Sequence, residues 1–407
     1  MGKMDIWYGF ACHSIDLLNQ RGVVCFIAQN NWTTSSGAKK LRYKVLKDTR
    51  ITQLLDFNTY MVFSEAGIQT MVMIFSRNTS RAMHQIDLRT LLPGATKDDM
   101  IALLNKNSTQ HTDYKEIIFE AQPSDNPLTF SGDEDLLSKI KRNKVFLMDD
   151  EVAQGIVFPQ DFLDKRGQSK LGSHAIGDGI FGLSMEEYRS LSLNDTEKAL
   201  IKPYYTTAEI RRYYTEPNNH KWLIYTDSTF SDPRSLDNCP TLKAHLDQFQ
   251  SVITSSNKPY GLHRARKEHF FKGEKIVSLR KCVGMPCFSY SDFDCYVTQT
   301  FFVIQTSRWD LRFLTGLLNS KMIAYWLKKK GKMQGDNYQV DKEPLIMIPL
   351  PSPESEQESI ASKVSAIIDG KRRDPEFNTL ELEKQIDRIV YELYGLDSAE
   401  ISIIESN

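Results

Sequence analysis

One apolar run near the start of the chain constrains its fold most. Residues 23–28 read Val-Val-Cys-Phe-Ile-Ala, and an apolar run of this length without polar interruptions is typical of a strand buried in a parallel sheet. Apolar residues at helical spacing predict a helix before it, over residues 5–19, and another after it, over residues 35–47. Strands are predicted at residues 51–57 and 70–75. Strand, helix and strand with short connections predict an α/β layer with parallel pairing.

This α/β layer is incomplete. A doubly wound α/β domain needs a first strand, a glycine-rich turn and several crossovers, whereas this chain opens on a helix and supplies only the last few strands. Such a half-sheet leaves a strand edge and an apolar face uncovered. The pattern therefore predicts either a partner that covers this edge or a longer polypeptide of which the chain is a part.

The pattern loosens after about residue 79, and the composition turns polar between residues 105 and 126, so we place a domain boundary at residue 120. The following region mixes short β-like runs with short helices, which predicts an α+β domain. The clearest segments there are β-like runs at residues 221–225, 296–304 and 345–348 and a helix at residues 311–326. The end of the chain is predicted to be helical, and Asp397 with Glu400 forms a capping-box pattern.

The charge balance excludes a globally basic nucleic-acid binder. Lysine and arginine number 51 and aspartate and glutamate 52, a formal net charge of −1, so any attraction for nucleic acid must be local. Residues 258–281 supply a local charge, because eight basic residues stand there against two acidic ones, a net charge of +6. A second basic cluster follows, made by Lys328, Lys329, Lys330 and Lys332.

Both basic stretches are interleaved with aromatic and amide side chains. Lysine and arginine attract phosphates, while arginine and the amides can bond base edges bidentately. We therefore predict that both stretches contact DNA; an ordinary solvated surface is the alternative. The predicted contact residues are Lys258, Tyr260, His263, Arg264, Arg266, Arg280, Lys281, Lys330, Lys332, Gln334, Asn337 and Gln339.

Three further patterns point to chemistry only weakly. The six cysteines never occur as Cys-x-x-Cys, which favours reduced thiols in a cytoplasmic protein, with a zinc site from Cys282, Cys287 and Cys295 as the alternative. Residues 177–182 fit Gly-x-Gly-x-x-Gly, but no good strand precedes them, which favours a loop over a dinucleotide site. No carboxylate constellation suggests a nuclease. Neither a signal peptide nor a membrane span is predicted.

Short segments follow one another in a recognisable order through the whole chain. In the first part they are residues 22–32, 40–42, 54–57, 62–66 and 70–74. They resemble the gamma-class adenine-N6 DNA methyltransferases, in particular the type IIG restriction–modification enzymes, where they follow the catalytic Asn-Pro-Pro-Tyr as motifs V to VIII. Residues 177–181, 202–205, 257–266, 314–320, 334–344 and 389–396 are similar to that group's specificity domain.

The resemblance implies a fold and a division of the chain. Residues 1–120 are expected to form an α/β partial Rossmann-like methyltransferase half-domain. Residues 121–407 are expected to form an α+β target-recognition domain, with C-terminal helices over residues 354–407.

The resemblance also implies a function. The complete enzyme is expected to transfer a methyl group from S-adenosylmethionine to N6 of a target adenine, and this chain to choose the DNA sequence. The cofactor turn is missing, and Asn257-Lys-Pro-Tyr260 has Lys258 where the catalytic motif needs proline. The chain is therefore expected to bind no cofactor and to be inactive alone, with Mg²⁺ required only if a nuclease region is attached.

Phe63 is the one residue that the resemblance ties to the reaction. The family packs this aromatic against the flipped adenine; an ordinary core aromatic is the alternative. The expected partners are double-stranded DNA and the missing N-terminal methylase part, and no membrane. The rival hypothesis is a stand-alone specificity subunit that partners a separate methylase chain.

Overall fold

The computed structural model describes residues 4–63, 65, 67–77, 84–119, 128, 134–142, 144–158, 160–334 and 337–406. The chain divides into two units, Met1–Arg142 with Trp326–Gln339, and Asn143–Tyr325 with Val340–Asn407. The domain boundary expected at residue 120 lies outside the described residues. The division in the structure follows Arg142. Each unit has its own core and is described by itself.

The first unit is built on a five-stranded sheet with the order β1-β3-β2-β4-β5. Its strands are β1 (Val23–Gln29), β2 (Thr49–Asp56), β3 (Thr70–Arg77), β4 (His84–Leu91) and β5 (Thr112–Phe119). Strand β3 is antiparallel to both β1 and β2, while β2 and β4 are parallel. Strands β1, β2 and β4 therefore run in the same direction, and their carboxyl ends lie at one edge of the sheet.

Strand β1 corrects the predicted buried parallel strand. It lies at the edge of the sheet, pairs only with antiparallel β3 among the described residues, and leaves Val23 60% and Ile27 44% exposed. The side chains of opposite parity, Val24, Phe26 and Ala28, pack against the core. Apolar composition alone cannot show which face of a strand its own unit covers, and this is why the prediction is wrong.

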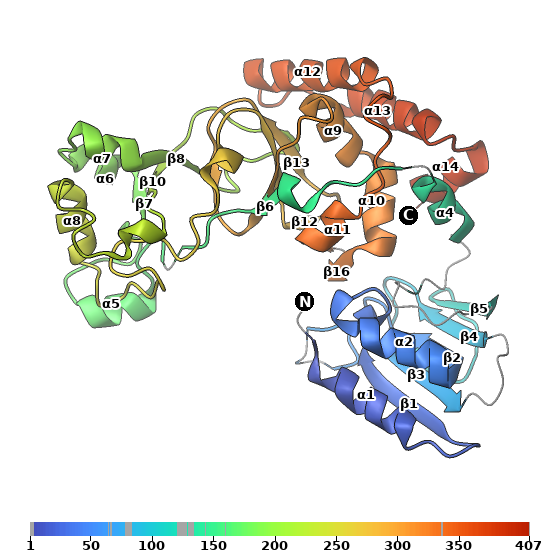
Figure 1. The fold of residues 1–407 in the computed structure, drawn as a ribbon. Helices are drawn as coiled ribbons and strands as arrows, with labels where there is room; N and C mark the ends of the chain where they lie inside the picture. Colours follow the sequence, from blue (N-terminus) through green and yellow to red (C-terminus); the bar gives the residue numbers. More distant parts are fainter. Residues whose placement is uncertain are drawn as a thin grey trace. The chain divides into compact units, whose positions relative to one another are not determined.

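Helices α1 (Ile6–Asp16) and α2 (Lys39–Asp48) cover one face of this sheet (Figure 1). Both are confirmed predictions, but two of the apolar residues at helical spacing that predicted α1, Ile6 and Phe10, do not face the core. It buries Tyr8, Ala11 and Ile15, whereas Ile6 and Phe10 are 77% and 62% exposed. The helix is apolar on two sides, so its periodicity could not select the buried one.

The opposite face of the sheet is covered only in part. Near β2 and β4, a small apolar cluster of Leu55, Phe57, Leu91 and Leu103 packs with helix α3 (Lys97–Leu104). At β1 the side chains of this face remain exposed. The unit also includes α4 (Glu134–Lys141) and an antiparallel hairpin of β16 (Lys332–Gln334) and β17 (Asn337–Gln339).

The second unit contains mixed sheets. One has the order β14-β8-β10-β7 and the other β6-β15-β11-β13-β9. The strands are β6 (Val152–Gln154), β7 (Gly182–Ser184), β8 (Ile201–Tyr205), β9 (Tyr213–Tyr214), β10 (Lys221–Ile224), β11 (Lys275–Leu279), β13 (Phe288–Ser291), β14 (Tyr296–Val297) and β15 (Phe301–Ile304). A shorter strand, β12 (Lys281–Val283), lies between β11 and β13 in the sequence. Together with the first unit this makes a mixed α/β fold.

Helices surround these sheets. They are α5 (Lys165–Leu171), α6 (Met185–Ser190), α7 (Asp195–Leu200), α8 (Pro240–Asp247), α9 (Leu311–Leu318), α10 (Lys321–Lys330), α11 (Lys342–Ile346), α12 (Glu358–Arg373), α13 (Leu380–Leu393) and α14 (Ser398–Glu405). Helices α9, α12 and α13 pack together, with α9 against β13 (Figure 1). The predicted C-terminal helices and the Asp397–Glu400 capping box are confirmed.

Two segment predictions are corrected in this unit. Residues 345–348 do not form a strand: residues 345 and 346 end helix α11, and residues 347 and 348 follow it as a turn. Pro344 stands in the first turn of α11, where no backbone N–H is needed. The single helix predicted for residues 311–326 is two helices, broken at Asn319 and Ser320. Asn319 is fully buried and its side chain bonds both backbone groups of Phe288, accepting from N at 3.0 Å and donating to O at 2.7 Å. That clamp fixes the break.

Candidate nucleic-acid interface

The first basic stretch, residues 258–281, runs through a loop, a short 3₁₀ turn and strand β11 of the second unit. Arg264 anchors the loop through an antiparallel bridge to Val157, with backbone N–O distances of 3.0 and 3.1 Å. Four cations are exposed, and their side chains have no hydrogen-bond or ion-pair partner among the described residues. They are Lys258, Arg264, Lys267 and Lys281. These four are available to an anionic ligand.

The other cations of this stretch have internal partners. Lys275 is fully buried and its Nζ donates to the carbonyl oxygens of Gly273 and, at 2.6 Å, of Phe293; burial lowers its pKa to about 8. Arg266 donates to Gly155 O at 3.3 Å and to Gln154 Oε1 at 2.9 Å. Burial, with the charge of Arg264, lowers the pKa of the Arg266 guanidinium.

Two more of the basic residues are ion-paired. Arg280 Nε lies 2.6 Å from Asp341 Oδ1, and Lys272 Nζ lies 3.2 Å from Glu268 Oε2. Pairs of this kind on a surface contribute little stability, but they lower the net charge that the stretch presents to a ligand. The positive charge free to meet a ligand is therefore that of the four exposed cations rather than the +6 counted from the sequence.

Tyr260 and His263 lie on the same loop. Tyr260 is 4% exposed and its hydroxyl donates to Asp247 Oδ1 at 2.8 Å, so its ring belongs to the core. Burial, with that hydrogen bond, raises the Tyr260 pKa to about 12. His263 is half-buried, with Nδ1 3.3 Å from Ser256 Oγ. Asn257 Nδ2 donates to Leu262 O at 2.7 Å, which closes the loop on itself and leaves its amide engaged.

The second basic stretch falls in the first unit, at the end of α10 and in the β16–β17 hairpin. Lys330 is half-buried, Asn337 is exposed and Gln339 is buried. The backbones of Lys332 and Gln334 lie in β16, but their side chains lie outside the described residues. Of the predicted amide contacts whose side chains are described, Asn337 is exposed and Gln339 is not.

Phe63 lies on the segment that joins β2 to β3, and its side chain is 46% exposed. The segment leaves the sheet at the common carboxyl edge of β1, β2 and β4. There the Oδ1 atom of Asp56 accepts from Asn30 Nδ2 at 3.1 Å and from Asn58 N at 2.9 Å, and Asn58 Nδ2 donates to Leu91 O at 3.2 Å. Burial raises the pKa of the Asp56 carboxyl, and these hydrogen bonds oppose the rise.

This latch ties the three strand ends together beside Phe63. Sequence reasoning missed Asn30, Asp56 and Asn58, although polar residues at the end of a strand, such as Asn58 after the predicted strand 51–57, are a signal for such an edge. The exposure of Phe63 does not fit an ordinary core aromatic. Its role toward a base remains a prediction.

The glycine-rich segment 177–182 is a turn, as predicted. It follows α5 and ends on the first residue of β7, Gly182, so no strand leads into it. Gly179 N donates to Glu187 Oε1 at 2.6 Å, and a Cβ on Gly179 would lie 2.3 Å from Gly182 O. The glycine is required by close packing, and its amide is already used.

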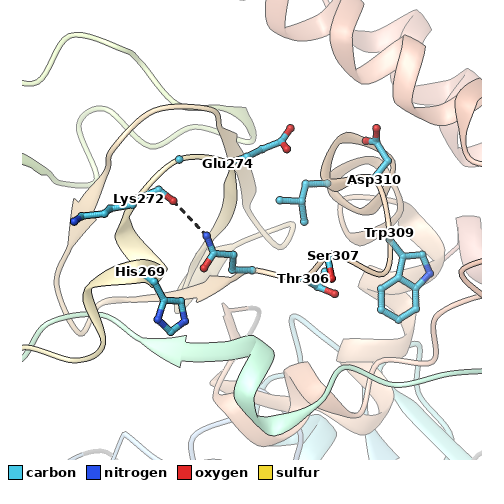
Figure 2. A pocket seen from close by; sticks show the side chains of 10 residues that line it. His269, Lys272, Glu274, Thr306, Ser307, Trp309 and Asp310 are labelled. Carbon is cyan, nitrogen blue, oxygen red and sulfur yellow. Dashed lines mark hydrogen bonds between the residues drawn. The ribbon is translucent and has the colours of Figure 1, made fainter.

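A hollow of about 730 Å³ lies between residues 269–274 and 305–311 of the second unit (Figure 2). Gln305 Nε2 donates to Lys272 O across it at 3.3 Å. Its carboxylates are engaged: Asp310 caps α9 through Arg312 N and Phe313 N, and Glu274 accepts from Arg312 and from the Tyr290 hydroxyl. We assign no ligand to this mixed-charge hollow.

No metal site is found in the part of the chain that the structure describes. Cys282, Cys287 and Cys295 are free thiols. Burial raises the pKa of Cys282 to about 11 and those of Cys287 and Cys295 to about 12. No described helix is long and apolar enough to span a membrane.

Two protein families match parts of the chain. Residues 1–63 match the Eco57I restriction-modification methylase family, and residues 202–350 match the TaqI-like C-terminal specificity domain. The first match covers α1, β1, α2, β2 and the segment up to Phe63. The second match contains both basic stretches, residues 258–281 and the region from Lys328 to Gln339.

Two relatives extend over almost the whole chain. The type II methyltransferase M.BstVI of Geobacillus stearothermophilus is 20% identical over 423 aligned residues, which cover 99% of this chain and 69% of that protein. The solved structure of the type IIL restriction-modification enzyme MmeI in complex with DNA matches with a TM-score of 0.59 and 14% identity, over 98% of this chain and 51% of that one. The chain thus spans about half the length of that enzyme. The resemblance to restriction–modification methyltransferases that the sequence predicted is confirmed, with a methylase-like start and a specificity-like second part.

Proposed function

We propose that this chain is the DNA-reading part of a restriction–modification adenine-N6 methyltransferase. The observation that carries the proposal is the set of exposed, unpartnered cations Lys258, Arg264, Lys267 and Lys281 among the described residues. They lie within the region similar to a specificity domain. A chain with a net charge of −1 that concentrates free positive charge there is suited to phosphate contact.

The two parts of the chain have different tasks in this proposal. Residues 1–120 are the C-terminal half of a Rossmann-like methyltransferase domain, and residues 121–407 are the target-recognition domain. The open β1 edge supports the first assignment, because a strand added there, with helices on both faces, would cover the apolar side chains of α1 and β1. That strand and its helices would come from the missing N-terminal methylase part.

Phe63 is the residue of this chain that touches the reacting base. A flipped adenine needs an aromatic surface to stack on, and Phe63 is exposed beside the carboxyl ends of parallel strands, where α/β sheets bind their ligands. The latch of Asp56 with Asn30 and Asn58 fixes the start of the segment that carries it. It is a positioning network, since it does not itself reach a base.

Among the described residues, the segment after β1 and the glycine-rich segment 177–182 do not offer a turn that fits S-adenosylmethionine. Strand β1 is followed by Asn30, Asn31 and Trp32 rather than by a glycine-rich turn, and the amide of Gly179 is taken by Glu187. We therefore propose that the cofactor is held by the complete enzyme outside this chain, and that the chain alone transfers no methyl group. Mg²⁺ is needed only if a nuclease region is attached.

The test is duplex DNA binding by this chain, followed by fluorescence polarisation over a series of salt concentrations. Each phosphate contact contributes a log–log slope of about −0.9, so four contacts give about −3.6. Calorimetry with S-adenosylmethionine should give no saturable heat at micromolar cofactor. A flat salt dependence contradicts the DNA assignment, and saturable cofactor binding contradicts the missing-half assignment.

The alternative is a stand-alone specificity subunit that partners a separate methylase chain. The open β1 edge favours a partner in either case. Coexpression with the adjacent reading frame separates the two: a stable complex that methylates DNA identifies a split system, and continuous coding with the upstream region identifies one long enzyme.

A further inference from the structure

Two segments of the second unit carry basic residues and no acidic ones. Residues 165–177, which include helix α5, contain three lysine and arginine residues and no aspartate or glutamate. Residues 248–267, which include the loop with Lys258 and Arg264, contain four and again no acidic residue. The two segments therefore have formal charges of +3 and +4, in a chain whose 52 acidic residues outnumber its 51 basic ones.

Contacts join the two acid-free segments. The ring of His174, three residues after α5, lies with its centroid 4.8 Å from that of the Phe249 ring. The next residue, Gln250, donates from Nε2 to Pro259 O at 3.2 Å, and Pro259 follows Lys258 directly. The end of α5 and the loop that carries Lys258 are therefore linked through residues 249 and 250, and their charges belong to one region of the unit.

Helix α5 is anchored by its cap and by its apolar side. Asp164 Oδ1 accepts from Gly167 N at 2.6 Å and so caps the first turn. Gly167 lies close to Leu163, because a Cβ added to it would come within 2.7 Å of Leu163 Cδ1. Leu171, four residues on, packs against the core of the unit. The side of the helix with Gly167 and Leu171 is thus turned inward.

Lys165, Arg166 and Lys170 are exposed on α5, and their side chains have no hydrogen-bond or ion-pair partner among the described residues. Arg166 and Lys170 stand four residues apart, the spacing at which side chains on a helix are neighbours, and two like charges there destabilise the helix. The carboxylate next to them in the sequence, Asp164, is used as the cap. An anionic ligand would offset this repulsion.

We propose that α5 binds the sugar–phosphate backbone of duplex DNA, beside the backbone that Lys258 and Arg264 contact. This rests on the proposed function and extends the interface to a helix outside both basic stretches. Hydroxyl side chains share backbone contacts with lysine and arginine, and the two acid-free segments also expose Ser169, Ser173, Ser251, Thr254 and Ser256. Backbone contacts carry no sequence information, so α5 positions the duplex and does not read it.

The experiment measures duplex binding by the whole chain over a series of salt concentrations. The triple variant Lys165→Ala, Arg166→Ala and Lys170→Ala should weaken binding to all sequences alike. It should also shrink the log–log salt slope by about 2.7, which is about 0.9 for each of three phosphate contacts. The melting temperature should not fall, because alanine favours a helix and the like-charge pair is removed.

The matched control is the triple variant Arg373→Ala, Lys384→Ala and Arg388→Ala, which removes the same charge from exposed residues of α12 and α13 in the same unit. It should keep the parent's salt slope, and a loss of about 0.9 or more in the α5 variant alone supports the contact. If the α5 variant keeps the parent's slope, or if both triple variants lose it equally, the inference is overturned although DNA binding stands. If the parent binds no duplex, the proposed function itself fails.

Discussion

The two units differ in where their exposed apolar side chains lie. In the first, Ile6, Phe10 and Val23 are all at least 60% exposed on the neighbouring elements α1 and β1, at the open edge of the sheet. In the second, exposed apolar residues such as Ile176 and Leu380 stand singly on separate elements, as on most soluble domains. Exposed apolar side chains of the first unit therefore lie together on α1 and β1, whereas those of the second unit lie apart from one another.

The stability of the second unit should depend most on hydrogen bonds in its own interior, and a substitution of Asn319 tests this. Replacing Asn319 by alanine leaves the buried N–H and C=O of Phe288 without their partner, at about 1–3 kcal/mol for each group. This is a large part of a typical domain's stability of about 5–15 kcal/mol. Chemical unfolding followed by circular dichroism should show the transition of the second unit at much lower denaturant.

Asn218→Ala is the matched control, because Asn218 is an exposed asparagine of the same unit. It should unfold as the parent does. Equal unfolding midpoints for Asn319→Ala and the parent would mean that the clamp does not hold this unit together, and the contrast between the units would weaken.

The first unit should show the opposite behaviour at its open edge. The triple variant Ile6→Ser, Phe10→Ser and Val23→Thr should leave its unfolding nearly unchanged, since these side chains face solvent and such substitutions change stability by less than about 0.5 kcal/mol. In the assembled enzyme the same changes should lower association with the methylase part at least about hundredfold, because each buried apolar side chain contributes about 1.5–3 kcal/mol.

Analytical ultracentrifugation of the chain with its methylase part measures this association. The triple variant Ile176→Ser, Leu380→Ser and Ile403→Ser, with exposed residues of the second unit, is the control and should associate normally. If both triple variants behave alike, the α1–β1 surface is not a docking face.

Much of the architecture of both units could be predicted, because apolar periodicity reports local structure directly. The helix at α1, the strand at β10 and the C-terminal helices follow from it. What periodicity cannot report is what lies on the other side of an apolar face. Strand β1 is the example, because its apolar run predicted a buried strand, whereas Val23 and Ile27 are exposed at the edge of the sheet.

Substitutions of Phe63 test whether a base stacks beside the common carboxyl edge of β1, β2 and β4 in the first unit. Phe63→Ala in the complete enzyme should lower methyl transfer by a factor equivalent to about 1–3 kcal/mol of lost stacking, whereas Phe63→Trp should retain most of it. Neither variant should lower the melting temperature much, since the side chain is half-exposed. The fluorescence of 2-aminopurine at the target position separates base flipping from the methyl transfer step. Equal losses with equal drops in melting temperature would make Phe63 a core residue.

The candidate interface could be located from the sequence but not resolved into residues. Charge counting finds the stretch 258–281, yet it treats Arg264, Arg266 and Lys275 alike. Only the structure separates them, because a loop has no periodicity that fixes side-chain direction. Arg264 is exposed, while Arg266 and Lys275 donate hydrogen bonds to backbone and side-chain oxygens of the same unit.

Arg264 and Arg266 therefore give the finest test of the contrast between surface and interior, two residues apart on one loop. Arg264→Ala removes an exposed cation with no side-chain partner among the described residues, so the log–log salt slope of DNA binding should shrink by about 0.9 with the melting temperature unchanged. Arg266→Ala instead removes the donors to Gly155 O and Gln154 Oε1, at a cost of about 1–3 kcal/mol. Alanine accepts the φ of +70° at this position no better than arginine does, so the loss reports the side-chain bonds. Arg266→Ala should lower the melting temperature of the second unit and keep the parent's salt slope in the folded protein. The opposite pattern, with stability lost at Arg264 and the salt slope at Arg266, would reverse the roles that burial assigns to them.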